Sequence, residues 1–585
     1  GSAGVPSITD IAVFDTNSAA AAVTVNASAS VAGISMTSGF GGNIAQGSNT
    51  IAVGLSNFAQ AGGTFTGGSV AITVNGDFSL TGGAFTSTSG TLSVGGSWSR
   101  TAGSFTHNSG TVAFTSTATG KTITAGSQTF SNLVLNGSGG NWALQDALTV
   151  ASNLTVTTGT LNANNQNINL AGNLSIANAA GFTKGSGALT LNGASQNFSD
   201  ANATPNDLGA VATSGTGTAT LTGNLRVTTM SIGNGTTLNL GAGSYTLTLT
   251  GTGTPITTNT TGTFSKGTGS TVNYTGTTTA TNVVTLAYNS LSFNPTAATT
   301  YSLTGNLTSA NALTGNITIG ANATLDATAS NYNITLSGNW SNSGAFTAQN
   351  TTVVLNGTNQ TISGNTTFNN LTKQVASAYT LTFTASSTQT VEGTLTANGA
   401  ASNLLSLHSS SASTQWNLVL NGSAAVSYAS VMDSNLTVNS ITPSNCANGG
   451  NNSSLWLFPI NVGASPTSVT VGDTVTFSGS GLGTITLYEW DFDGNGTYEW
   501  SSTSTGSITH VMPIVGTFTS NLRITYNDGS KLAADIGTSV TVAVRDPASN
   551  PSTNIIQLEK PGLVAGMSNS FTTGSNNPDT ELSSL

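Results

Sequence analysis

Apolar and polar residues alternate in short runs along most of this chain, and clusters of Gly, Asn and Ser separate the runs. The stretch GGTFTGGSVAITVNG around Phe65 shows the pattern, with Phe, Val and Ile at alternate positions. Such alternation predicts short β-strands that bury one face. The clusters between the runs predict tight turns. We therefore expect an all-β protein whose strands are joined by short connections.

The strand pattern repeats along the sequence. The phrases GGTFTGGSVAITVNG, GGAFTSTSGTLSVGG and AGSFTHNSGTVAFTS follow one another at about 20-residue spacing, each around one Phe. Their anchors are Phe65, Phe85 and Phe105. The phrase then returns at intervals of about 80 residues. The later anchors are Phe182, Phe264 and Phe346. A unit of about 20 residues is therefore nested in a super-repeat of about 80.

A unit this short cannot bury its apolar face alone, but stacked units can. We predict a long parallel β-solenoid over residues 51–457, with about 20 residues per coil and Phe stacked on Phe between coils. A string of small antiparallel β-sandwiches is the alternative, but it gives no reason for adjacent hairpins to repeat one Phe position. Residues 1–50 fit the phrase poorly, and we expect them to form a cap or a docking segment for another subunit.

Two longer stretches resemble a known class of protein. NWSNSGAFTAQNTTVVLNGTNQTISGNTTFNNLT is similar to runs in large bacterial and archaeal surface proteins built from parallel β-helix repeats. LLSLHSSSASTQWNLVLNGSAAVSYASVMDSNLTV resembles the closing coils of such proteins. The resemblance covers about three quarters of the chain. It implies an extracellular location at the cell surface and a solenoid architecture, and it transfers no active site.

The sequence changes character after Pro459, where acidic residues become several times denser and Gly-Thr phrases thin out. We expect a linker over 458–462 and a separate domain over 463–545. The run LYEWDFDGNGTYEW and the later ITHVMPIVGTF resemble the hallmark phrases of the PKD family. The matching residues are Tyr488, Trp490, Asp491, Phe492, His510, Pro513, Gly516 and Phe518. The resemblance implies an immunoglobulin-like β-sandwich that serves as a spacer or as a protein and carbohydrate contact module.

Alternation within this domain predicts that Trp490 lies in the sandwich core. Its expected neighbours are Val475, Phe477, Phe518 and Leu522. A Trp in this position could also stack on a sugar ring if it were exposed.

Four residues of the same domain form a candidate calcium site. Asp491, Asp493 and Asn495, followed by Gly496, have the spacing of the first ligands in an EF-hand-like loop, and Glu499 could contribute from the ninth position. The bidentate Glu expected at the twelfth position is absent. Asp-Gly and Asn-Gly pairs are also strong turn formers. The loop is therefore either a hairpin turn or a calcium site, and no other cofactor is expected.

The last segment, 546–585, opens with DPASNPSTN, which is typical of a linker. It contains one short apolar run at Ile555, Ile556 and Leu558 in a polar context. We expect a tail that either packs on its own chain or adds a strand to a neighbouring subunit.

Charge and composition exclude several functions. Only 5% of the 585 residues are charged, and the net charge is -10. The ten Lys and Arg residues are scattered singly, which excludes a nucleic-acid interface. No apolar run approaches the ~20 residues that a membrane span needs. The single cysteine, Cys446, excludes an internal disulfide and is either a buried thiol or an intermolecular bridge.

The acidic residues do not indicate an enzyme. Polysaccharide lyases and hydrolases need carboxylates that converge with each other or with a base on adjacent coils. Asp200 and Asp207 are the closest pair in the solenoid and lie in an irregular stretch where we expect a turn. His107, Lys184 and Lys266 each follow an anchor Phe by two residues, which indicates an outward, variable position. We predict no catalytic residues.

Two structural functions remain. The first is a subunit of an extracellular filament or sheath that assembles head to tail as a homopolymer. The second is a monomeric adhesin stalk that binds a glycan or a host surface. A polysaccharide-active enzyme is a third and weaker alternative.

Overall fold

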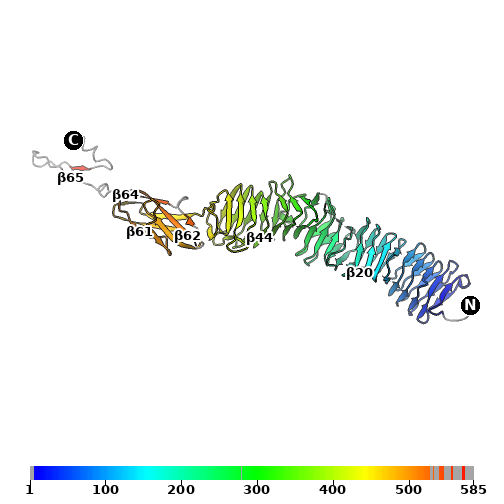
Figure 1. Ribbon diagram of the computed structural model, residues 1–585. Coiled ribbons are helices and arrows are strands. Elements are labelled where there is room, and N and C mark those ends of the chain that lie inside the picture. Colours follow the sequence, from blue (N-terminus) through cyan, green and yellow to red (C-terminus); the bar gives the residue numbers. More distant parts are fainter. Residues whose placement is uncertain are drawn as a thin grey trace, which may run out of the picture. The chain divides into compact units, whose positions relative to one another are not determined.

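The computed structural model describes residues 6–277, 280–526, 531–532, 539–545, 555–557 and 570–572. Within these residues the protein is built from β-strands, with two short 3-10 turns, η1 (Thr16–Ser18) and η2 (Ser309–Asn311). The chain divides into two compact units, residues 1–369 and 370–585. Figure 1 shows short strands following one another along the first unit and, in the second, further coils and a separate group of strands.

Residues 11–450 form a parallel β-solenoid of about 21 turns, with about 21 residues per coil. The predicted fold class, an all-β solenoid followed by a β-sandwich, is confirmed. Coil length varies more than the 20-residue phrase suggests. For example, Leu291 pairs with Ile317, and Ile317 pairs with Trp340. The strand register is preserved because additional residues enter the turns, where no partner strand constrains them.

The first three anchor phenylalanines, Phe65, Phe85 and Phe105, occupy one five-stranded sheet. Its strands are β2 (Ala22–Thr24), β5 (Asn43–Ala45), β8 (Thr64–Thr66), β11 (Ala84–Thr86) and β14 (Ser104–Thr106). Phe85 pairs in register with Phe65 on one side and Phe105 on the other. The rings lie nearly parallel, with centroids 4.7 Å and 6.1 Å apart. The predicted aromatic stack is confirmed for these coils.

A glycine precedes β5, β8, β11 and β14 of this sheet, and before the Phe strands it makes the close turn possible. Gly83 has a φ of 73°, and a Cβ there would lie 2.4 Å from the carbonyl oxygen of Gly63 in the preceding coil. Gly63 and Gly103 also have positive φ. Only a residue without a side chain fits this approach, so the repeated Gly fixes the corner of the coil.

Aromatic contacts recur across the super-repeat. The Trp98 ring lies 5.0 Å from Phe105 and 5.2 Å from Phe130. Trp340 lies 5.0 Å from Phe346 and 5.3 Å from Phe368, in the same arrangement.

An internal glutamine recurs as well. Gln196 donates to the carbonyl oxygens of Leu170 and Gly172 and accepts from the Gly193 amide. Gln360 makes the corresponding bonds with Leu336, Gly338 and Gly357. Gln196 and Gln360 therefore make the same set of hydrogen bonds in two different coils of the solenoid.

The later anchors do not stack on phenylalanine. Phe182 pairs with Leu161, Phe264 with Leu238 and Phe346 with Leu325. The prediction that Phe stacks on Phe from coil to coil is therefore wrong for these anchors toward the preceding coil, while toward the following coil Phe346 makes a tilted contact with Phe368 at 6.2 Å. Leu fills the same inward position because the core requires apolar volume there, and an aromatic ring is only one way to supply it.

Solenoid pairing begins before residue 51, the expected start of the solenoid. Strand β1 (Ile11–Phe14) pairs with β4 (Gly33–Met36), and β3 (Ala29–Val31) pairs with β6 (Ile51–Val53). The segment over 1–50 therefore contributes coils of its own. It lacks the Phe phrase, but alternate residues still point inward, such as Ile34, Met36 and Ile44.

The second unit contains the last coils of the solenoid. Its parallel strands fall in three rows. The rows are β46 (Asn370–Gln374), β49 (Thr394–Asn398) and β52 (Ser423–Ser427); β47 (Thr380–Phe383), β50 (Leu405–Ser409), β53 (Ala429–Met432) and β55 (Ala447–Gly450); and β48 (Thr388–Val391), β51 (Trp416–Leu420) and β54 (Ser434–Val438). Trp456 and Phe458 are buried after the last coil, and Trp456 Nε1 donates to Ser434 Oγ at 3.0 Å. These rings cover the apolar interior at this end.

A β-sandwich follows. One sheet contains β56 (Ile460–Ser465), β58 (Thr474–Gly481) and β61 (Ile508–Val511). The other contains β57 (Ser468–Thr470), β64 (Ser539–Arg545), β62 (Gly516–Tyr526), β59 (Ile485–Asp491), β60 (Trp500–Ser502) and β63 (Lys531–Leu532). The segment expected to be a linker, 458–462, instead contains the buried ring of Phe458 and the start of β56, which is paired from Ile460 onwards.

Trp490 lies fully buried in the core of this sandwich. Val475, Phe477 and Leu522 are buried around it, and Phe518 packs against the same cluster. The Trp490 indole Nε1 donates to the Gly506 carbonyl oxygen at 2.9 Å. The predicted core is confirmed, and burial removes Trp490 as a sugar-stacking residue.

Two short strands of the tail are described. β65 (Ile555–Gln557) and β66 (Ser570–Thr572) pair antiparallel as a two-stranded sheet. The rest of the predicted tail, 546–585, lies outside the described residues.

Candidate functional sites

The candidate calcium loop connects β59 and β60, which form an antiparallel hairpin. Asp491 ends β59, and Asp493, Asn495 and Glu499 follow in the connection. Gly494 and Gly496 have φ of 76° and 89°, which curls the backbone around the Asp491 carboxylate. One carboxylate oxygen from each of Asp491, Asp493 and Glu499 lies within 4.8 Å of the other two. The fold therefore brings the three predicted acids together.

Main-chain amides occupy much of this carboxylate surface. Asp491 is 1% exposed and accepts from the amides of Gly494 at 2.7 Å and Gly496 at 2.9 Å. Glu499 Oε2 accepts from the Phe492 amide at 2.8 Å. Asn495 Oδ1 accepts from the Thr497 amide at 2.7 Å, so this oxygen is turned into the loop. These contacts are those of a hairpin turn built on Asp491.

The same atoms fit a calcium ion in part. Carboxylate oxygens are the hard ligands that calcium prefers, but Asp491 Oδ1 already accepts from the amides of both Gly494 and Asn495. A calcium ion takes at least six oxygens, however, and the three acids supply only part of that set. The calcium site stays a hypothesis alongside the turn.

Beside this loop, the His510 ring stacks on Phe492, with centroids 3.9 Å apart. Burial lowers the pKa of His510, and the nearby Glu499 carboxylate opposes that shift. The PKD-like phrase of the sequence thus places His510 in a packing role against the acidic loop.

The acids of the solenoid hold its turns. Asp200 is buried, and its two carboxylate oxygens accept from the amides of Asn202 and Asn206. Asp207 Oδ2 lies 2.5 Å from Lys184 Nζ, on the neighbouring coil. Burial raises the pKa of Asp207, but hydrogen bonds from Lys184, the Gly209 amide and the Thr250 hydroxyl outweigh burial and hold it below its usual range.

Sequence reasoning missed the pairing of Lys184 with Asp207. The signal was present, because the two residues lie about one coil apart and the solenoid brings such positions together. The Lys184 side chain is 41% exposed, in agreement with the predicted outward position. The Thr228 hydroxyl completes the cluster at 2.6 Å from Lys184 Nζ. The bonds of Lys184 and Thr228 to Asp207 join neighbouring coils.

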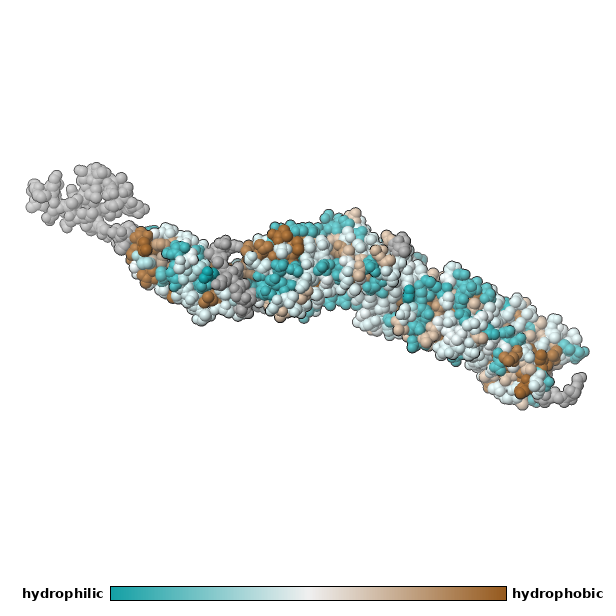
Figure 2. Space-filling model, in the orientation of Figure 1, coloured by the Kyte–Doolittle hydropathy of each residue, from teal (hydrophilic) through white to brown (hydrophobic). Residues whose placement is uncertain are grey.

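The first coil carries an apolar hollow of about 310 Å³. Its lining includes Phe14, Val23, Ile34 and Ile44, which belong to the interior of the first coils. Strands β1, β2 and β3 each pair with a strand on one side only among the residues that the structure describes. Apolar side chains also stand exposed around this end. They are Ile8 at 72%, Ile11 at 51% and Val13 at 57%. Figure 2 shows brown surface gathered here.

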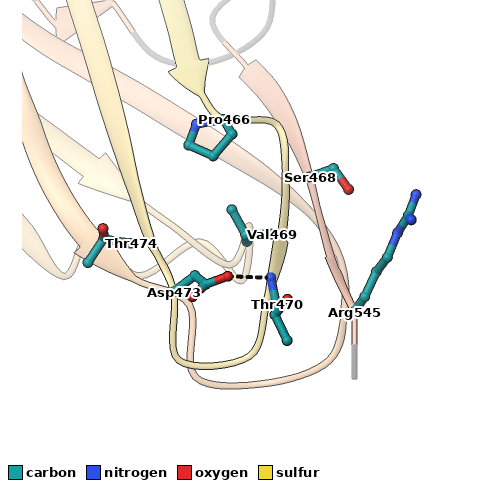
Figure 3. Close-up of a pocket in the computed structure, with 7 residues that line it drawn as sticks. All are labelled: Pro466, Ser468, Val469, Thr470, Asp473, Thr474 and Arg545. Carbon is teal, nitrogen blue, oxygen red and sulfur yellow. Dashed lines mark hydrogen bonds between the residues drawn. The ribbon is translucent and has the colours of Figure 1, made fainter. Parts of the chain in front are cut away.

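A second, open hollow of about 400 Å³ lies on the β-sandwich between β57, β58 and β64. Pro466, Thr470, Asp473 and Arg545 are among its lining residues. Figure 3 shows the Thr470 amide donating to Asp473 Oδ2 at 2.9 Å, while the Arg545 side chain points away from that pair. The hollow contains one acid, Asp473, and one base, Arg545, and their side chains do not point toward a common position.

Apolar side chains also stand exposed at the end of β61 and on the connection that follows it. Val511 is 49% exposed, Ile514 65% and Val515 52%. This loop is a candidate contact surface, because exposed apolar residues are concentrated there.

The family model of the PKD domain matches residues 459–535. A comparison of the chain with curated proteins finds no match. The sequence resemblance to a solenoid followed by a PKD domain is thus confirmed in both parts. This combination is typical of extracellular bacterial proteins. Over the described residues, the structure contains no helix with the length and apolar character of a membrane span.

Proposed function

We propose that this protein is a structural subunit of an extracellular filament or sheath, in which copies of the chain join head to tail. The observation that carries the proposal is the difference between the two ends of the solenoid. Among the described strands, those of the first coil pair on one side only, around an apolar hollow of about 310 Å³. The last coil is covered by Trp456 and Phe458.

The covered end also joins the β-sandwich. The Asn448 amide donates to the Leu482 carbonyl oxygen at 3.3 Å, and Asn448 forms a parallel bridge with Gly483. Backbone groups at the end of the last coil are thus used within the chain. Open strand edges at the first coil are templates for pairing with another chain, and proteins normally cover such edges.

Joining unlike ends gives a heterologous contact, which continues from copy to copy unless the rotation closes a ring. The solenoid suits a structural role, because its coils pair with each neighbour through parallel backbone ladders. No catalytic role is proposed, since Asp200, Asp207 and Lys184 all serve contacts within the solenoid.

A monomeric adhesin stalk is the second candidate. The exposed apolar loop at Val511, Ile514 and Val515 favours it, because a PKD domain at a surface can serve as a contact module. The hydroxyl- and amide-rich surface of the chain also suits sugar hydroxyls.

Light scattering after size-exclusion chromatography, with negative-stain microscopy, tests the proposal on the purified chain. We expect fibres whose mean length increases with protein concentration. A single species of 58.1 kDa at every concentration would contradict the filament proposal and favour the monomeric stalk. Glycan-array binding by that monomer would then support the adhesin, and release of sugar from polysaccharides would support an enzyme.

A further inference from the structure

The sheet that contains the anchor phenylalanines ends in an open edge at β2. Inward residues run along this sheet in strict register: Phe85 pairs with Phe65, Phe65 with Ile44, and Ile44 with Val23. Val23 also lines the apolar hollow of the first coil. Among the described strands, nothing pairs with the outer edge of β2. One further strand with an inward apolar residue would continue both the ladder and the core.

The tail of the chain contains such a strand. Ser570–Thr572 has the sequence Ser-Phe-Thr, identical to β14 (Ser104–Thr106) of this same sheet. The related strands β8 and β11 read Thr-Phe-Thr and Ala-Phe-Thr. Asn569 precedes Ser570 where Gly103 precedes Ser104. Gly103 has positive φ, and Asn is one of the residues that best tolerates that conformation.

The tail strand is formed but incompletely paired. β66 (Ser570–Thr572) pairs with β65 on one edge, and no strand of the described residues pairs with its other edge. An isolated two-stranded sheet is marginally stable in water, so adding it to a larger sheet is favourable. Among the described strands, β66 therefore has one unpaired edge, which could pair with the unpaired edge of β2.

We propose that β66 of one copy adds as a parallel strand to the outer edge of β2 in a second copy and places Phe571 over Val23. This inference rests on the proposed function, because it names the contact that joins successive subunits. The mode is β-strand addition, in which backbone bonds give affinity and an inward pocket gives specificity. The hollow lined by Phe14, Val23 and Ile44 is the pocket that receives the ring.

The connection is long enough for this exchange. About 25 residues separate Arg545, the end of β64, from Ser570, and a fully extended chain of that length spans at most ~80 Å. The tail can therefore reach beyond its own β-sandwich to another molecule. Burial of one Phe side chain accounts for an affinity change on the order of 10- to 100-fold, so Phe571 is the residue to perturb.

Two blocking variants test the contact in the full-length chain. Phe571→Asp disables the donor strand, and Val23→Asp disables the acceptor edge. We expect each variant alone to remain at the mass of one chain, 58.1 kDa, under conditions in which the native chain forms polymers. Phe571→Leu, which keeps an apolar side chain, and Val438→Asp, which changes a 63% exposed valine elsewhere, should both polymerise.

Mixing the two blocked variants gives the decisive measurement. Each retains one working end, so a mixture should form a complex of about twice the single-chain mass and no larger species. Circular dichroism of each variant confirms that it is folded, and a variant that is not folded is replaced by deletion of residues 546–585 or by Val23→Asn.

The outcomes separate this inference from the proposed function. If Phe571→Asp forms the same polymers as the native chain, the proposed tail contact is wrong, but the proposal of a filament is retained. Loss of polymers in Ile514→Asp but not in Phe571→Asp assigns the contact to the loop after β61 and also overturns it. A native chain that is monomeric at every concentration removes the filament, and with it the contact between copies.

Discussion

Replacement of Phe85 by Ala tests whether the aromatic stack holds the solenoid together locally. Phe85 is 1% exposed, and its ring contacts four others. The centroid distances are 4.7 Å to Phe65, 4.9 Å to Phe78, 5.4 Å to Phe58 and 6.1 Å to Phe105. Loss of a buried Phe side chain usually costs ~3–5 kcal/mol, and each aromatic pair adds ~0.5–1.5 kcal/mol beyond burial. We expect about 4 kcal/mol for Phe85→Ala, since the contributions overlap.

The matched control is Phe264→Ala. Phe264 is half-buried, pairs with Leu238 in the strand ladder and contacts the Tyr288 ring at 5.6 Å. With partial burial and a looser aromatic contact, its loss should cost about 1–2 kcal/mol. The two variants remove the same atoms, so a difference between them reports the environment of each ring.

Hydrogen exchange followed by mass spectrometry is the appropriate assay, because a solenoid opens locally and a single unfolding midpoint would average its coils. A loss of about 4 kcal/mol should speed exchange of the β8, β11 and β14 amides by about 10³-fold. Peptides from β46 to β55 should keep their native rates. Equal effects of the two variants, or unchanged exchange in β11, would refute the argument that the stacked rings stabilise these coils.

Further predictions concern buried polar groups. Burial lowers the pKa of Lys373 to about 8, against 10.5 in the unfolded chain, so the unfolded state binds more protons between these values and the free energy of unfolding should rise through that window. Chemical denaturation at several pH values should show this rise, about 3 kcal/mol in size, in the native chain relative to Lys373→Met, and parallel profiles would contradict it. Asp491→Ala should destabilise the PKD domain by about 3 kcal/mol, because the main-chain amides of Gly494 and Gly496 lose a charged and buried acceptor; denaturation followed by tryptophan fluorescence measures the loss, and a loss below about 1 kcal/mol would count against the turn. Isothermal titration tests calcium at the same loop: sub-millimolar heats that vanish in Asp493→Ala support the metal, and no heats in the native chain assign the acids to the turn alone. Cys446 is 1% exposed, and burial raises its pKa to about 11, so alkylation at pH 8 should be at least about 100-fold slower than in the urea-unfolded chain; similar rates in both states would show that the thiol is accessible.

Much of the candidate site could be predicted from local sequence. Asp491, Asp493 and Glu499 are close in sequence, and Gly494 and Gly496 between them predict the turn that brings them together. The direction of the Asn495 side chain could not be predicted, because it depends on two hydrogen bonds within the loop: Oδ1 accepts from the Thr497 amide and Nδ2 donates to Asp493 Oδ2. The pairing of Lys184 with Asp207 required the true coil length, which differs from 20 residues where turns are longer.

The fold class could be predicted from the amino-acid pattern, because periodic alternation with Gly at the corners is best satisfied by stacked coils. The Trp490 core and the stack of Phe65, Phe85 and Phe105 could also be predicted from the sequence. The start of the solenoid became visible only in the folded chain, since the first coils carry no Phe phrase and are recognised by strand pairing. The tertiary structure also decided which end is covered and which presents open edges, because that depends on contacts between residues far apart in the chain and not on any local pattern.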